Sequence, residues 1–123
     1  METDVLSLLL NATPSKLPEK DYKIIRLSEE LGADVIFKLR ALPYSRVSEL
    51  RSVDQENYLI HIVLAGVISP NLRDQALMDK YDATTPVDAL KALLLPGEID
   101  DLAIRVEQLS GYKKEVTEEI RKN

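Results

Sequence analysis

The sequence predicts a mainly α-helical fold, a small helical bundle that can also hold a short N-terminal β-hairpin. The 123 residues are enough for one domain, and a 45% apolar share with 30% charged residues is typical of a globular chain. Proline and capping residues divide the chain after residue 42 into segments of helix length. Because aromatic residues make up only 5% of the chain, we expect a mostly aliphatic core.

Prolines and shifts of polarity divide the chain into four regions. We expect an apolar helix in residues 1–12, a linker in 13–21, the main globular domain in 22–112 and a weakly helical tail in 113–123. The linker is mostly polar and contains two prolines. No run approaches the roughly 20 apolar residues of a membrane span, so we expect no membrane partner.

The N-terminal helix is predicted from Thr3, a suitable N-cap, to Leu10. All positions from Val5 to Leu10 except Ser7 are large aliphatic residues. So short a helix is unstable alone, so we expect it to dock on the body, on a partner or on a second copy. The candidate partner-binding residues in this helix are Leu6, Leu9 and Leu10.

Two β-strands are predicted after the linker, over Tyr22–Leu27 and Val35–Leu39. The second alternates between an apolar face and a more polar one, as a half-buried strand does. Ser28–Leu31, between them, has the length of one helical turn, which Gly32 would end. A single helix over Lys23–Leu31 is the alternative.

All segments after residue 42 are predicted to be helical. The expected helices are Pro43–Ser52, one capped by Asp54 and ending near Val67, one from Asn71 to Tyr81, one from Thr85 through Leu94, and one from Pro96 to Gly111. The second of these is apolar on nearly every side, which is typical of a helix in the middle of a bundle. We therefore expect Leu64 and Val67 to be buried. A weak last helix is predicted in Tyr112–Asn123.

His61 is the only histidine, and it lies in the most apolar predicted helix. A catalytic histidine needs a positioned nucleophile and an orienting carboxylate. Asp54 and Glu56 are seven and five positions away, which does not place either beside His61 on one helix. We expect a core histidine and no enzyme activity, and a small hydrolase centred on His61 is the weakest alternative.

The acidic cluster, the lack of cysteine and the net charge all argue against catalytic, metal or nucleic acid sites. Glu98, Asp100 and Asp101 fall in the first turn of a predicted helix, where the helix dipole favours negative charge. The chain has no cysteine, so thiolate metal sites and thiol nucleophiles are excluded, and we expect no catalytic residue, metal or cofactor. A net charge of −5 opposes binding to nucleic acid phosphates.

Basic residues gather near the second predicted strand. Lys38, Arg40 and Arg46, with Arg51 further along, give a local excess of positive charge. A solvated face is the simpler interpretation, and no aromatic residues are interleaved as in nucleic acid sites. We expect the first three to be exposed and to supply specificity for an acidic protein partner.

Three segments carry a family resemblance. They are VIFKLRALPY at 35–44, LAGVISPNLRD at 64–74, and LLLPGEI at 93–99 followed by LSGY at 109–112. Their order and spacing resemble the XkdN-like phage tail assembly chaperones. The leucine-rich N-terminus and its proline-containing linker agree with the same family. The resemblance covers nearly the whole chain, and it transfers no catalytic residue.

The resemblance implies a protein of a tailed phage or prophage that binds the tape-measure protein, keeps it soluble and helps recruit tail-tube subunits. It also implies a location in the host bacterial cytoplasm, absence from the mature virion and, in many members, a longer frameshifted product. The acidic residues Glu2 and Asp4 agree with the lack of a secretion signal. A small non-catalytic adaptor or regulatory domain unrelated to phage is the alternative, which gene context would distinguish.

Overall fold

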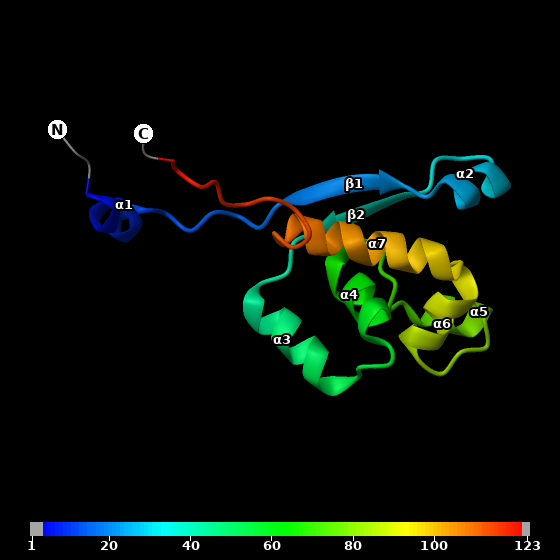
Figure 1. Cartoon of the computed structure of the whole chain (residues 1–123). Coiled ribbons are helices and arrows are strands. Elements are labelled where there is room, and N and C mark those ends of the chain that lie inside the picture. The colour runs from blue at the N-terminus through cyan, green and yellow to red at the C-terminus, as the bar shows by residue number, and fades with distance from the viewer. Residues whose placement is uncertain (1–3, 122–123) are drawn as a thin grey trace.

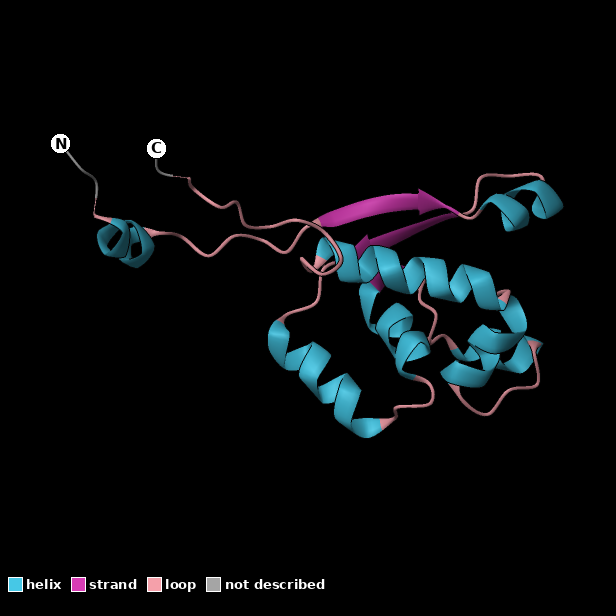
Figure 2. Ribbon diagram, viewed as in Figure 1, coloured by secondary structure: helices cyan, strands magenta, loops and turns pink. Residues whose placement is uncertain are grey.

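The computed structural model describes residues 4–121. This part of the chain forms seven helices and a three-stranded antiparallel sheet (Figure 1 and Figure 2). The helices are α1 (Val5–Asn11), α2 (Ile25–Leu31), α3 (Tyr44–Val53), α4 (Tyr58–Gly66), α5 (Gln75–Lys80), α6 (Pro86–Leu93) and α7 (Pro96–Leu109). The strands are β1 (Glu19–Lys23), β2 (Ile36–Arg40) and β3 (Val67–Ser69). The fold is therefore mixed α/β and not a purely helical bundle, and the predicted hairpin is present.

The hairpin is formed by β1 and β2, which pair antiparallel with Tyr22 opposite Phe37. Phe37 and Leu39 of β2 are buried while Lys38 and Arg40 are exposed, because successive side chains of a strand point to opposite faces. The inner face of the hairpin lies along α7, whose other side packs on α4 (Figure 1).

The predicted position of the first strand is wrong by several residues. Ile25–Leu31 forms α2, close to the alternative single helix, and β1 takes up Glu19–Asp21 from the expected linker. α2 ends at Gly32, which adopts a φ of 69° that favours glycine. The buried Ser28 fixes this helix to the residue just before β2, because its hydroxyl accepts a hydrogen bond from the Val35 amide at 2.9 Å.

The third strand, β3, continues directly from α4 and pairs with β2. The predicted helix over this region was expected to reach Val67, but it ends at Gly66 and Val67 is extended. Leu64 and Val67 are nevertheless 5% and 8% exposed, so their predicted burial is confirmed. A strand of three residues is too short to show an alternating pattern, and this explains why the sequence did not indicate it.

The predicted helix starts at Thr85 and Pro96 are confirmed, and those at Asp54 and Asn71 are wrong. Thr85 accepts a hydrogen bond from the Asp88 amide, and α7 begins at Pro96, as expected. Asp54 does not cap α4, which starts only at Tyr58, and Asp74 caps α5 in place of Asn71. No helix in residues 4–121 is long and apolar enough to cross a membrane.

The described terminal segments, α1 with the residues that connect it to β1 and residues 113–121, extend from the same end of the body (Figure 1). None of the residues of α1 is buried, and its N-cap is Asp4, while the predicted cap Thr3 lies outside the described residues. The predicted C-terminal helix is wrong as far as the structure describes it, because residues 115–121 contain no helix. Residues 122 and 123 of that prediction lie outside the described part.

Candidate functional site

The first candidate surface is the apolar helix α1. Leu6, Leu9 and Leu10 are 61%, 68% and 75% exposed. Polar side chains hold both ends of the helix, because Asp4 accepts a hydrogen bond from the Leu6 amide at 3.2 Å and Asn11 donates to the Ser7 carbonyl at 2.8 Å. The helix is therefore formed without any cover on its leucines, and such apolar surface is typical of an interaction site.

The second surface is a groove of about 770 Å³ lined by residues of α2, α5 and α6, by Phe37 of β2 and by the segment between β3 and α5. It lies at the end of the molecule opposite α1 (Figure 1). Its lining is mainly apolar and includes Leu27, Leu31, Val35, Leu77 and Leu93. Local sequence patterns could not indicate this groove, because its walls come from segments that are far apart along the chain.

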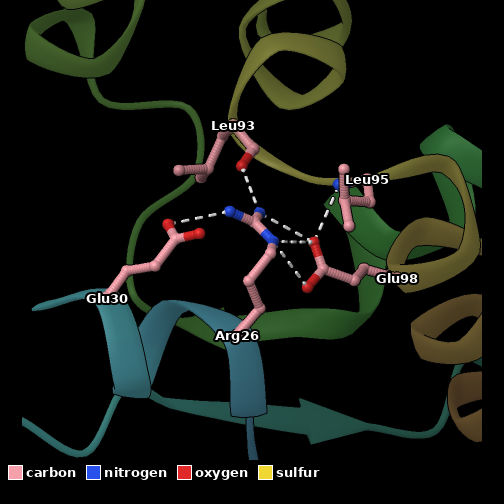
Figure 3. A network of polar contacts seen from close by, with 5 residues as sticks. All are labelled: Arg26, Glu30, Leu93, Leu95 and Glu98. Atoms are coloured by element: carbon pink, nitrogen blue, oxygen red, sulfur yellow. Dashed lines mark hydrogen bonds and ion pairs between the residues drawn. The ribbon is translucent and has the colours of Figure 1, made fainter.

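Arg26 joins one wall of this groove to the start of α7 (Figure 3). Its Nη2 atom donates to the Leu93 carbonyl at 3.1 Å and to Glu98 Oε1 at 2.9 Å, and its Nη1 atom donates to Glu30 at 3.1 Å. Glu98 Oε1 also accepts a hydrogen bond from the Leu95 amide at 2.7 Å. The Glu98 carboxylate therefore caps α7, as its place in the first turn indicated, and also fastens α2 to the α6–α7 turn.

This network sets the ionisation of Glu98. The hydrogen bonds from Arg26, assisted by the Leu95 amide, lower the pKa of Glu98 from its ordinary value of 4.5 although burial opposes the shift. Because a lowered pKa means that folding favours the charged form, the stabilisation is complete above pH 4.5 and is lost as pH falls through the pKa of the folded state.

We expect Glu98→Gln to weaken the loss of stability on acidification. The amide oxygen of glutamine can still cap α7, but the ion pair with Arg26 is removed. Urea unfolding midpoints measured stepwise from pH 7 to pH 3 should therefore decline less steeply in the variant. Glu29→Gln, which neutralises an exposed carboxylate on α2, serves as the matched control. Parallel curves for wild type and Glu98→Gln would contradict the role of the ion pair.

His61 has a carboxylate partner that its spacing did not indicate. The Nε2 atom of His61 lies 3.1 Å from Asp54 Oδ2, because Asp54 lies in the loop before α4 and not on the helix itself. Asn57 donates hydrogen bonds to the Asp54 carboxylate from both its backbone N–H and its side-chain Nδ2. The hydrogen bond from the Asn57 side chain is the main cause that lowers the pKa of Asp54, and the hydrogen bond with His61 is the next. In the structure these contacts hold the α3–α4 loop.

The predicted basic residues do not form one cluster. Lys38 lies opposite Asp21 in the sheet and lines a small hollow on the hairpin. Arg40 is exposed and Arg46 half-buried, and both line a different hollow together with Arg73. Arg73 was missed by the sequence analysis because β3 brings it to this place from a distant part of the chain.

Comparison with known proteins agrees with the resemblance noted in the sequence. The model of the family described as phage XkdN-like tail assembly chaperone protein matches residues 6–122. The chain belongs to this family. The chaperone also resembles the crystal structure of the protein yqbn, with a TM-score of 0.71 and 19% identity over 91% of this chain and 100% of that chain. This likeness shows a shared fold, and comparison with curated protein sequences gives no match.

Proposed function

We propose that this tail assembly chaperone binds the tape-measure protein, keeps it soluble and helps recruit tail-tube subunits around it. We place this activity in the cytoplasm of the host bacterium, with the chaperone absent from the finished virion. The role is one of binding and release, without catalysis or a cofactor. The observation that supports it most directly is the uncovered apolar surface of α1.

A long helical client such as a tape-measure protein presents apolar stripes that must be shielded from water. Helices of this kind are commonly bound through apolar side chains and grooves, and α1 and the groove between α2, α5 and α6 offer both. Residues 12–18, which connect α1 to β1, are all exposed. Seven extended residues span about 23–25 Å, so α1 can follow a client over a considerable distance. Val116 and Ile120 add a smaller exposed apolar segment at the other end of the chain.

The test is replacement of Leu6, Leu9 and Leu10 together by alanine, which retains helix propensity while it removes apolar surface. We expect the affinity for the tape-measure protein to fall at least about tenfold, or about 1.4 kcal/mol, and the soluble yield of the co-expressed client to fall with it. Titration of the purified client and its soluble fraction in co-expression are the measurements. The melting temperature should change little, because α1 is exposed.

The matched control is Ile25→Ala with Val53→Ala, two aliphatic residues that are 69% and 74% exposed on other helices. Unchanged affinity in the α1 variant would show that α1 is a passive terminus. A change in mass in solution without a change in client binding would instead assign α1 to self-association. Recruitment of tube subunits is tested separately, since tube protein should co-sediment with the chaperone only when the client is present.

A further inference from the structure

Three arginines from separate elements line one hollow of about 570 Å³, which we call the basic hollow. Arg40 comes from the end of β2, Arg46 from α3, and Arg73 from the segment between β3 and α5. Leu64 and Leu72, both buried, lie among its other lining residues and give it a firm apolar base.

The positive charge of the basic hollow is largely uncompensated. Arg46 forms an ion pair with Glu49 at 3.1 Å. Arg40 and Arg73 form none with any carboxylate in residues 4–121, although Glu19 is the sheet neighbour of Arg40. Asp74 is engaged elsewhere, since it accepts a hydrogen bond from the Ala76 amide at 2.8 Å as the cap of α5. Two guanidinium groups are thus available in a chain whose net charge is −5.

The chemistry of the hollow favours a peptide over a nucleic acid. Guanidinium groups bind carboxylates in a planar, two-bonded geometry, and exposed Ile68 and Pro43 offer apolar contact beside them. No aromatic side chain lines the hollow, so bases would have nothing on which to stack. The complementary ligand is a segment in which Asp or Glu residues accompany aliphatic ones.

We propose that the basic hollow binds an acidic, partly aliphatic segment of the client protein. The proposal rests on the proposed function for the identity of the client, but it concerns a surface separate from α1. It gives Arg73 a role beside Arg40 and Arg46, and it excludes Lys38, which lines another hollow. The carboxylates of the client would replace the missing ion-pair partners of Arg40 and Arg73.

The C-terminal tail of the chaperone itself also combines acidic and aliphatic residues. Glu115, Glu118 and Glu119 accompany Val116 and Ile120 there. The tail begins near the hollow, because the Leu42 amide donates to Ser110 Oγ at 2.9 Å. It extends away in the structure, and none of its described residues lines the hollow. We therefore assign the hollow to the client, and occupation by the tail is an outcome that the experiment distinguishes.

The experiment compares the wild-type chaperone with a variant in which Arg40, Arg46 and Arg73 are all replaced by glutamine. The control replaces the exposed Lys16, Lys20 and Lys91 by glutamine, which gives the same change in net charge. Affinity for the tape-measure protein is measured at about 50 and 300 mM salt, because exposed ion pairs weaken as salt rises. We expect the arginine variant to bind at least about tenfold more weakly at low salt and to lose most of the salt dependence, while the control keeps both.

A second arm uses a synthetic peptide of alternating glutamate and isoleucine, with a glutamine-for-glutamate version as its control. Binding should shift the NMR signals of the Arg40 and Arg73 side chains only with the acidic peptide. Failure of wild type to bind the tape-measure protein, with these shifts present, would overturn the proposed function and leave the hollow as an acidic-peptide site for another client. Equal client binding by wild type and the arginine variant, or absence of the shifts, would overturn the inference. Deletion of residues 115–121 that abolishes the difference between wild type and variant would assign the hollow to the tail and also overturn it.

Discussion

Leu64→Ala should lower the free energy of unfolding by about 2–5 kcal/mol, the range for a buried leucine whose neighbours relax only in part. Leu64 is 5% exposed and belongs to α4, which packs against α3, α6 and α7. Its contacts with three other helices hold α4 in place, so the space that the truncated side chain leaves can close only in part. The expected cost therefore lies well above the effect of a typical surface substitution.

Urea unfolding followed by circular dichroism measures this change. Leu31→Ala is the matched control, since it removes the same atoms from a helical leucine that is 69% exposed. Its free energy of unfolding should change by less than about 0.5 kcal/mol. Equal unfolding midpoints for wild type and Leu64→Ala would show that α4 does not form the centre of the core.

Elements with their own start and end signals could be predicted from the sequence. The cap at Thr85 and the proline at Pro96 mark the starts of α6 and α7, and both were predicted from the sequence. The end of α2 at Gly32 was predicted, but the start of α2 and the strand β3 could not be, because they depend on tertiary contacts. Ile25 has strong β propensity yet lies in a helix that a distant ion pair fastens to α7.

The candidate surfaces divide in the same way. The apolar surface of α1 could be predicted from local composition, because all positions from Val5 to Leu10 except Ser7 are large aliphatic residues. The basic hollow could be predicted only in part, because Arg40 and Arg46 are near in sequence whereas Arg73 arrives through β3. Likewise, no local pattern connects Arg26 with Glu98, and their pairing depends on how α2 lies against the α6–α7 turn.

Gly66 of α4 lies against Val106 of α7 with no room for a side chain, and its substitution gives the second large expected effect. A β-carbon at Gly66 would lie 2.5 Å and 2.7 Å from the two γ-carbons of Val106. Val106 is fully buried and β-branched, so its side chain has little freedom to turn away. The two helices would have to separate, and overpacking of this kind costs about 1–3 kcal/mol. That cost exceeds the gain of up to about 1 kcal/mol that alanine offers over glycine in a helix.

Gly66→Ala should therefore lower the melting temperature. Gly97→Ala should leave it unchanged or raise it slightly, because no atom outside the adjoining residues and the local helix backbone lies within 4 Å of the new β-carbon. The decisive measurement is a double-mutant cycle with Val106→Ala. Truncation of Val106 alone leaves a cavity, but in the Gly66→Ala background the new methyl group fills part of that space. The double variant should be more stable than the sum of the two single losses predicts, by about 0.5–3 kcal/mol. Additive losses would mean that α4 and α7 adjust around Gly66 without strain, and the close approach would then not restrict the residue at this position.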